Sequence, residues 1–297
     1  YEAWYPVFAK SGLAVATWPV AYGGLDLAPK VARAVEAELA PYNLGRLNPL
    51  GLNLAAPALF AYGTEEQRLR FLPPMVRNEE VWCQLFSEPG AGSDVAGLSA
   101  RAVKDGEEWI ANGQKVWTTL AHLSRFGLLV VRTDPEAVKH AGLTAFVVDM
   151  QAPGVEVRPL RQMTGEAEFN EVYFTDVRIA EAEMLGNPGD GWRVSLTTLM
   201  NERVSIGGAI PQQGSGSIAI AVKEWKALPE DRRDASTRDE LMKLWIRAEV
   251  HRLTNIRANA QRRMGAPGPE GSIGKMESAN LNKDVYAFAI GLMGADG

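Results

Sequence analysis

A turn rich in glycine and side-chain oxygens follows an apolar run in the first third of the chain. It reads CQLFSEPGAGSD, starting at Cys83. Gly90 and Gly92 allow positive φ and close approach of a ligand, and successive N–H groups in such a turn can bind an anion. Side chains that can donate to a ligand or brace the turn stand beside them: Ser87, Ser93 and Asp94. The pattern predicts a loop that holds a phosphate-bearing cofactor, with an ordinary turn as the alternative.

A second stretch, NGQKVWTTL, places an aromatic ring beside two hydroxyl groups. Trp117 is followed directly by Thr118 and Thr119. A planar ring next to hydroxyl donors suits a planar heterocycle with polar edges. The alternative is a core tryptophan with the threonines on the wet face of a strand, because aromatic side chains are mostly buried.

A third candidate is the charged pair Glu202–Arg203 within a helical pattern. The helical neighbours of Glu202 are small or apolar: Ser195, Thr198, Leu199, Ser205, Ile206 and Ala209. Arg203 falls on the apolar stripe formed by Leu196, Leu199, Ile206 and Ile210. A desolvated carboxylate in such a place can take a proton from a substrate. The alternative is a solvated Glu202 beside an Arg203 held in a structural ion pair.

The remaining titratable residues suggest structural roles. His122, His140 and His251 are isolated in the sequence, and Glu88 beside Pro89 is expected to hold the shape of the loop. No cluster has metal-ligand spacing, so no metal site is predicted. GSGS at 214–217 lacks the lysine of a P-loop, and no convincing G-x-S-x-G nucleophile motif is present.

The elements around these residues fall into three zones, which predict an α+β multidomain fold. Residues 1–80 read as helices, one of them capped by Thr64 and ending at Pro73-Pro74. Residues 81–185 read as a compact antiparallel sheet, with hairpin turns at Asp105-Gly106 and Asn112-Gly113. From about residue 186 the period is helical again, with Ser236 and Thr237 as capping-box candidates.

Composition limits the classes of partner. The chain has 297 residues, 46% of them hydrophobic, which suggests two domains as a soft prior. The net charge is -5, which argues against a nucleic-acid partner. Cys83 is the only cysteine, which favours a reducing cytoplasm over a disulfide framework, and no apolar window of about 18 residues predicts a membrane span. The chain starts at Tyr1 without methionine, so we expect a fragment of a longer protein.

Taken together, SEPGAGSD and NGQKVWTT resemble the flavin-binding signature of the acyl-CoA dehydrogenase family. Four further segments stand in the order of the family: WPVAYGG, YGTEEQRLRFLP, FTDVRIAEAEMLG and GWRVSLTTLMNER. The resemblance implies an N-terminal helical domain at 1–80, a central antiparallel β-barrel-like domain at 81–185, and an incomplete C-terminal helical bundle at 186–297.

The resemblance also implies roles for the residues of both motifs. The segment from Gln84 to Ser93, which includes Gly92, would wrap the flavin of FAD. Phe86 and Ser87 would lie at the pyrimidine edge of the ring, and Ser93 would contact the acyl-CoA. Trp117 would cover the face of the ring away from the substrate. Thr118 and Thr119 would bond near N5 and along the ribityl chain.

The family removes a proton from Cα of an acyl-CoA thioester and a hydride from Cβ, which yields the trans-2-enoyl-CoA. A desolvated carboxylate takes the proton, and the resemblance offers Glu202 for it, with Asn201 and Arg203 binding substrate. Another branch of the family keeps this base in a loop that would lie beyond Gly297. The resemblance further implies an electron-transfer flavoprotein as acceptor and a homodimer or homotetramer.

One departure from the family pattern keeps other functions open. Many members carry an R…FG segment through which a neighbouring subunit contacts FAD, whereas this chain reads AVKEWKALPEDRRDASTRDEL there. The chain can therefore be a non-catalytic partner subunit of a mixed tetramer. A flavin oxidase or monooxygenase that uses oxygen is a third possibility, and the acyl chain of the substrate does not follow from the sequence.

Overall fold

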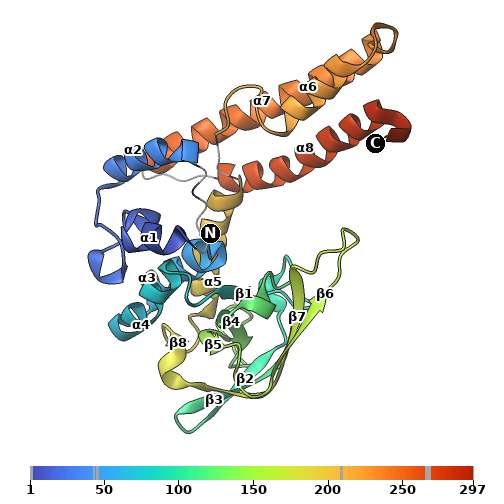
Figure 1. The fold of residues 1–297 in the computed structure, drawn as a ribbon. Helices are drawn as coiled ribbons and strands as arrows, with labels where there is room; N and C mark the ends of the chain where they lie inside the picture. The colour runs from blue at the N-terminus through green and yellow to red at the C-terminus, as the bar shows by residue number, and fades with distance from the viewer. Residues whose placement is uncertain (1–2, 43, 45–46, 208–209, 265–268, 297) are drawn as a thin grey trace. The chain divides into compact units, whose positions relative to one another are not determined.

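A computed structural model describes residues 3–42, 44, 47–207, 210–264 and 269–296 (Figure 1). The chain divides into two compact units, Tyr1–Asn201 and Glu202–Gly297. Helices come first, strands follow, and helices return, which confirms the predicted fold class. The domain bounds at 1–80, 81–185 and 186–297 stay a prediction.

The first unit opens with short helices. They are α1 (Tyr5–Lys10), α2 (Pro29–Leu39), α3 (Ala56–Tyr62) and α4 (Glu65–Val76). The predicted cap is confirmed, because Thr64 Oγ1 accepts the Gln67 N–H at 3.2 Å and the Gln67 side chain accepts the Thr64 N–H at 2.8 Å. The predicted end at Pro73-Pro74 is wrong, since α4 continues to Val76. Burial of the last turn outweighs the prolines' cost, which is about 3 kcal/mol or more in a helix interior.

The first unit then forms one eight-stranded sheet in the order β6-β7-β3-β2-β4-β5-β8, with β1 pairing to β4. The strands are β1 (Trp82–Leu85), β2 (Arg101–Asp105), β3 (Glu108–Lys115), β4 (Phe126–Arg132), β5 (Leu143–Asp149), β6 (Val155–Leu160), β7 (Phe169–Ala180) and β8 (Met184–Leu185). Most pairs are antiparallel, as predicted, but β1 and β2 both pair with β4 in parallel. This arrangement places β1 and β3 in one sheet, and the two candidate motifs start within these strands and continue past their ends.

One of the two predicted hairpin turns is present. Asp105 ends β2 opposite Glu108, and Gly106 begins the two-residue turn into β3. Asn112 and Gly113 instead lie inside β3, where the register against β7 shifts. Gly113 has φ +145°, and a Cβ there would stand 2.5 Å from the Ala100 side chain, so the glycine is needed for a β-bulge with a close contact. The predicted turn at Asn112-Gly113 is therefore wrong.

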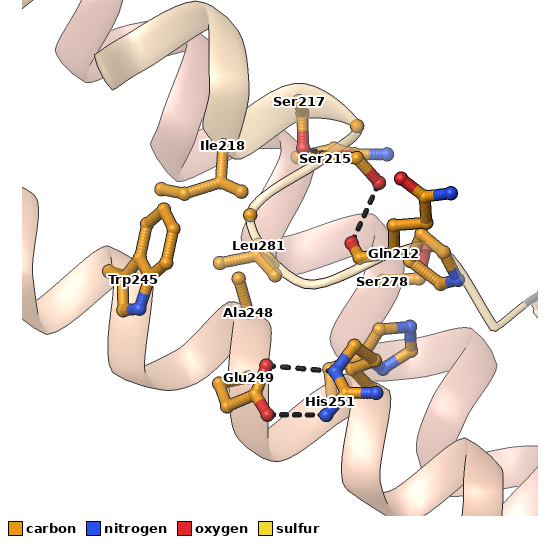
Figure 2. A pocket seen from close by; sticks show the side chains of 15 residues that line it. Gln212, Ser215, Ser217, Ile218, Trp245, Ala248, Glu249, His251, Ser278 and Leu281 are labelled. Atoms are coloured by element: carbon orange, nitrogen blue, oxygen red, sulfur yellow. Dashed lines mark hydrogen bonds and ion pairs between the residues drawn. The ribbon is translucent and has the colours of Figure 1, made fainter.

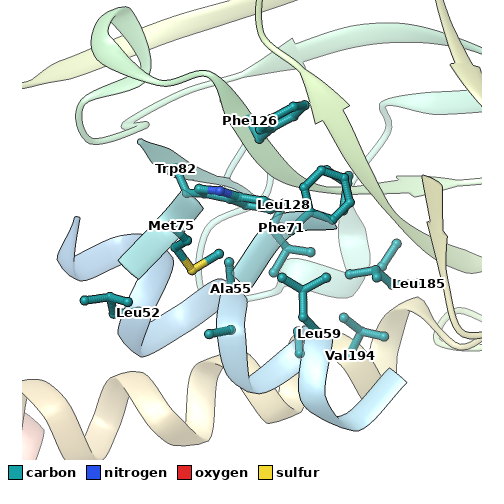
Figure 3. Packing of buried hydrophobic residues seen from close by; sticks show 14 of the residues in the cluster. Leu52, Ala55, Leu59, Phe71, Met75, Trp82, Phe126, Leu128, Leu185 and Val194 are labelled. Carbon is teal, nitrogen blue, oxygen red and sulfur yellow. The ribbon is translucent and has the colours of Figure 1, made fainter. Parts of the chain in front are cut away.

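Two apolar clusters cover opposite faces of β4. Phe126, Leu128 and Val130 belong to a cluster shared with α3 and α4, whereas Leu129 and Val131 belong to a cluster among the strands. In the first cluster the Phe71 ring lies edge-on to Trp82 and to Phe126, with centroids 5.4 and 5.1 Å apart (Figure 3). Burial on both faces explains why β4 reads as an unbroken apolar run. Cys83 of β1, with 2% of its surface exposed, lies in the cluster among the strands.

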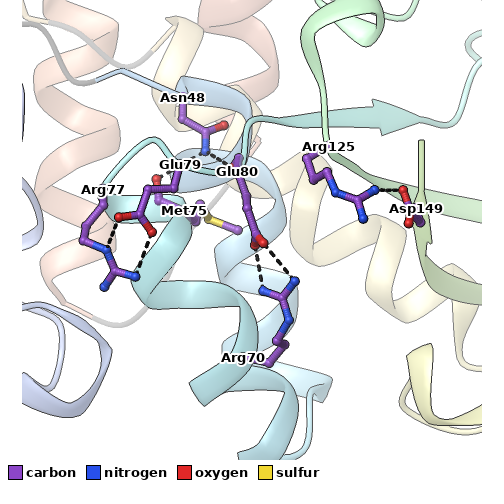
Figure 4. Close-up of polar contacts among 8 residues, drawn as sticks. All are labelled: Asn48, Arg70, Met75, Arg77, Glu79, Glu80, Arg125 and Asp149. Atoms are coloured by element: carbon purple, nitrogen blue, oxygen red, sulfur yellow. Dashed lines mark hydrogen bonds and ion pairs between the residues drawn. The ribbon is translucent and has the colours of Figure 1, made fainter. Parts of the chain in front are cut away.

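Polar contacts fix the entry into β1 (Figure 4). The Asn48 amide donates to the carbonyls of Met75 and Glu80 at 3.3 and 2.9 Å, and its oxygen accepts the Trp82 N–H at 3.0 Å. Arg70 binds both oxygens of Glu80 at 2.8 Å. The end of α4 and the start of β1 are thereby held together, which positions the turn that follows β1.

Of the predicted apolar stripe on helix α5 (Gly191–Gly207), Leu199 is half-buried against the first cluster, and the side chain of Ile206 lies outside the described residues. Leu196 is 38% exposed, and Ile210 lies beyond the helix and is 43% exposed. Among the described side chains of α5, the fully buried ones are Val194, Ser195 and Thr198. The hydroxyls of Ser195 and Thr198 are satisfied inside the protein. Ser195 donates to the Gly191 carbonyl at 2.7 Å, and Thr198 donates to the Leu54 carbonyl at 3.3 Å.

The second unit contains α6 (Ser217–Ala227), α7 (Ala235–Arg263) and α8 (Glu270–Met293). They pack around apolar side chains such as Ile218, Leu244 and Val285. The N-cap of α7 is Asp234, whose carboxylate accepts the Thr237 N–H at 2.7 Å, so the predicted caps Ser236 and Thr237 are wrong. Among the described residues, no helix has the length and apolarity needed to cross a bilayer.

Candidate functional site

The turn after β1 closes on itself. Glu88 N–H donates to the Ala91 carbonyl at 2.9 Å, and Ala91 N–H returns the bond to Glu88 at 3.1 Å. Positive φ, which we expected at Gly90 and Gly92, is found at neither, because this reciprocal pair makes the turn without it. A Cβ at either glycine would meet nothing within 4 Å. The glycines therefore leave open space above the turn rather than relieving backbone strain.

The two candidate motifs lie side by side. Val116 N–H donates to the Ser87 carbonyl at 2.9 Å, which joins the end of β3 to the turn after β1. Within the described residues, neither the N–H nor the hydroxyl of Ser87 has a hydrogen-bond partner, and the side chain is half-buried. Ser87 thus offers two donors beside the second motif.

Trp117 has an exposed ring on a strained backbone. Its φ is +59°, and 63% of its surface is exposed. Among the described aromatic rings, that of Phe169 stands near it, edge-on, with centroids 6.2 Å apart. A bulky residue in the left-handed region is a genuine outlier, and such outliers gather at functional sites. The alternative of a buried core tryptophan is wrong.

Thr118 is buried with a hydroxyl that lacks a partner. Its N–H donates to the Asn170 carbonyl at 3.0 Å, and its own carbonyl accepts the Asn170 amide at 2.9 Å. Its Oγ1 has no hydrogen-bond partner within the described chain. Buried hydroxyls are normally satisfied, so this atom is available to a ligand. Thr119 is half-buried.

A buried ion pair that sequence reasoning missed lies beneath both motifs. Lys115 Nζ donates to Glu88 Oε1 at 2.8 Å and to the Phe86 carbonyl at 3.1 Å. Burial lowers the pKa of Lys115 to about 8, although the Glu88 charge opposes this shift. Burial pushes the pKa of Glu88 up, but the Lys115 charge and the hydrogen bonds to the carboxylate outweigh it, so that pKa lies below its usual value. A lysine at an inward position of a strand was the signal in the sequence.

The other residues of the first motif differ in exposure. Gln84 is half-buried, Phe86 is buried, and Ser93 is exposed, as is Gly92. Asp94 forms an ion pair with Lys139 and makes no side-chain cap to the following turn. The expectation that Asp94 accepts backbone N–H groups is therefore wrong.

Glu202 begins the second unit and is bound by a lysine. Its carboxylate forms an ion pair with Lys275 of α8, and the Glu202 side chain is 18% exposed. The carboxylate is therefore partly buried and already paired, and its role as a base stays a prediction. The side chain of Arg203 lies outside the described residues. Asn201 is exposed, and its amide donates to the Thr197 carbonyl at 2.8 Å.

The second unit has a pocket of about 270 Å³ between the loop before α6 and the helices α7 and α8 (Figure 2). Trp245 and Ile218 line its apolar side, and Glu249 and Arg252 form an ion pair of 2.6 Å at its polar side. His251 is half-buried, and burial lowers its pKa. His122 is exposed and held locally by Asn170 at 3.1 Å. Within the described part of the chain, no three metal-ligating side chains converge.

Known proteins resemble this chain along its length. Family models described as the N-terminal, middle and C-terminal domains of acyl-CoA dehydrogenase match residues 2–79, 83–177 and 189–297. Acyl-CoA dehydrogenase IpdE1 of Mycobacterium tuberculosis is 38% identical over 100% of this chain and 77% of its own length. A solved structure described as Tcur3481-Tcur3483 steroid ACAD is 27% identical, covers 99% of this chain and 77% of that one, and has a TM-score of 0.81.

Another relative is much longer. Acyl-CoA dehydrogenase FadE34 of Mycobacterium tuberculosis is 40% identical over 90% of this chain. The present chain spans only 37% of the length of FadE34. The match to IpdE1 nevertheless extends over the whole of the present sequence, in the order of the three domains. This chain therefore belongs to the acyl-CoA dehydrogenase family.

Proposed function

We propose that the chain binds FAD at the paired motifs and catalyses α,β-dehydrogenation of an acyl-CoA thioester to the trans-2-enoyl-CoA. The bond from Val116 N–H to the Ser87 carbonyl supports this proposal, because it joins two segments far apart in the sequence into one surface that could hold a ligand. An ordinary turn would need neither the neighbouring exposed tryptophan nor an unpartnered buried hydroxyl.

The residues present fit FAD, the cofactor of this family. Trp117 offers an exposed ring, Thr118 a buried hydroxyl without a partner, and Ser87 two donors. An aromatic face with polar donors at its side matches a planar heterocycle with polar edges. The residues that would hold the cofactor are Gln84, Phe86, Ser87, Gly92, Ser93, Trp117, Thr118 and Thr119. When bound, FAD supplies a hydride acceptor.

Glu202 is our candidate for the base that removes the α-proton, with Ser93, Asn201 and Arg203 binding substrate. A general base needs a free oxygen lone pair within hydrogen-bond reach of the proton that it takes. One oxygen of Glu202 is bound to Lys275. Glu202 therefore acts through its other oxygen, or after Lys275 has left it.

For the substrate we propose a steroid-derived acyl-CoA. The support is the similarity to a solved protein that is described as a steroid ACAD. We further propose that an electron-transfer flavoprotein reoxidises the cofactor and that the chain works as an oligomer.

A second candidate function is that of a partner subunit in a mixed assembly. The similar steroid ACAD is described by two joined names, Tcur3481 and Tcur3483, and the present sequence lacks the R…FG segment. In that case the chain would contribute its flavin motifs or its fold to a catalytic chain that supplies the rest of the site.

The test uses purified full-length protein reconstituted with FAD. Flavin absorbance that stays with the protein through gel filtration supports the proposed site. Anaerobic mixing with acyl-CoAs, from short chains to branched and steroidal ones, should then bleach the flavin, and fastest with a steroidal thioester. Protein that is folded but remains colourless would contradict the homomeric enzyme and leave the partner subunit. Rapid reoxidation by air would instead indicate an oxidase.

A further inference from the structure

The buried ion pair of Lys115 and Glu88 is the most unusual charge arrangement near the proposed flavin site. The exposed fractions of the two side chains are 0% and 4%. A buried ion pair often contributes less to stability than apolar residues of similar volume would, because both charges lose their water. Its presence beneath the two motifs therefore calls for an explanation other than folding.

Glu88 holds the ammonium in place. Its Oε2 accepts the Ser99 N–H at 2.7 Å and the Ser99 hydroxyl at 2.8 Å, and its Oε1 accepts the Ala100 N–H at 3.0 Å as well as Lys115. Both carboxylate oxygens are thus engaged by at least two donors. The carboxylate cannot turn away without losing several buried hydrogen bonds at once.

The ammonium acts on one particular peptide group. Lys115 Nζ donates to the Phe86 carbonyl at 3.1 Å, and this carbonyl shares its peptide group with the N–H of Ser87. That N–H has no acceptor within the described residues. A carbonyl that accepts from a cation is polarised, and polarisation passes along a hydrogen-bonded chain in a low-dielectric interior. The Ser87 N–H therefore becomes a stronger donor.

We propose that Lys115 is a positioning residue for the flavin: it fixes and polarises the Phe86–Ser87 peptide, whose N–H would face a polar edge of the ring, while Glu88 fixes the ammonium. The inference rests on the FAD site proposed above. Charge near the ring nitrogens of a flavin tunes its electronics. A polarised donor at that edge favours the electron-rich form, so Lys115 should raise the flavin's reduction potential.

The effect should depend on pH in a defined direction. Because the pKa of Lys115 is lowered to about 8 by burial, the ammonium is fully charged below about pH 7 and loses its charge as the pH rises through about 8. Within the described chain, Glu88 is the only charged group that acts on it. The contribution of Lys115 to the potential should therefore fade above about pH 8.

The experiment compares the wild type with the double variant Lys115→Met/Glu88→Gln in full-length protein with FAD. The double variant removes both charges together, so no unpaired carboxylate is left in the interior. The matched control is Lys104→Met/Glu181→Gln, which makes the same substitutions at an ion pair with 49% and 39% exposed side chains. Midpoint potentials are measured by dye equilibration at several pH values.

We expect the buried-pair variant to shift the reduction equilibrium about tenfold towards oxidised flavin near pH 6.5, which is about 30 mV for a two-electron couple. The gap to the wild type should narrow above about pH 8, and the surface variant should follow the wild type. A folded buried-pair variant whose potential matches the wild type at every pH, or whose gap does not change with pH, overturns the proposal.

If the variant holds FAD too weakly for potentiometry, the dissociation constant of oxidised FAD is measured by flavin fluorescence at about pH 6.5 and 9. The proposal requires the ratio of the FAD dissociation constant of the buried-pair variant to that of the wild type to fall towards one at the higher pH. A constant ratio overturns it. A folded wild-type protein that binds no FAD contradicts the proposed function itself, whereas normal FAD binding without the pH-dependent gap contradicts only the role of Lys115.

Discussion

Trp117 combines two properties that a structural tryptophan rarely shows, a left-handed backbone and an exposed ring. If the ring covers a flavin, Trp117→Ala should weaken FAD binding. Aromatic pairs contribute about 0.5–1.5 kcal/mol beyond area burial, so we expect roughly 2- to 10-fold or more. Titration of the apoprotein with FAD, followed by fluorescence quenching, measures the change.

A suitable control is Val103→Ala on β2, because Val103 is 62% exposed and lies outside both motifs. This variant should bind FAD as the wild type does. Equal FAD affinity of the Trp117→Ala protein and the control would remove Trp117 from the proposed site.

Glu202 provides the kinetic test at the residue scale. General-base catalysis contributes about 10²–10⁴-fold, so Glu202→Gln should slow flavin bleaching by an acyl-CoA at least about 100-fold. Gln keeps the size and the hydrogen-bonding capacity of the side chain, so FAD and ligand binding should persist. Anaerobic stopped-flow absorbance gives the rate of the reductive half-reaction.

Glu277→Gln is the matched control, because Glu277 also pairs with a cation, Arg247, in the second unit at 3.1 Å. Its rate should stay near that of the wild type. Bleaching of the Glu202→Gln protein at the wild-type rate would make Glu202 a structural partner of Lys275.

At the scale of elements, helix α4 positions β1 through a locally encoded start. Thr64→Ala removes the side-chain acceptor of the capping box and should lower the free energy of unfolding by about 1 kcal/mol. Chemical denaturation of the full-length protein measures it. Thr164→Ala, in an exposed loop, is the same substitution without a cap and should change stability by less than about 0.5 kcal/mol. Equal stability of the two variants would contradict the importance of the cap.

The sequence predicted those elements whose signals are local. Thr64 caps a helix through a residue in its own first turn, and Asp105-Gly106 turns between adjacent strands, so both could be recognised. The turn at Asn112-Gly113 could not be rejected from the sequence. What makes it a bulge is contact with Ala100 and a register shift against β7, neither of which is local.

The same limit applies to the candidate site. The motifs of Ser87 and Trp117 could be found because glycine, hydroxyl and aromatic residues are adjacent in the sequence. The partner of Glu202 could not, since Lys275 lies on another helix of the second unit. Lys115 has an inward position in its strand, but the sequence does not show the buried partner, Glu88, that makes a charge tolerable there.

At the scale of the whole molecule, the proposed residues divide between the two units. Those proposed to hold FAD lie in Tyr1–Asn201, whereas Glu202 opens Glu202–Gly297. Because a ligand stabilises only the state that binds it, added FAD should protect the first unit directly. The chain contains a natural reporter for that unit.

The reporter is Cys83. Burial raises the pKa of its thiol to about 12, and a thiol reacts with labelling reagents only as the exposed thiolate. A maleimide or an aromatic disulfide should therefore modify native protein at pH 7 only when β1 detaches, and saturating FAD should slow the modification. Mass spectrometry follows the modification, with urea-unfolded protein as the fast reference. Equally rapid labelling of native protein would show that β1 opens freely. Slow labelling would make the modification rate of one sulfur atom a measure of how often the sheet proposed to hold FAD opens.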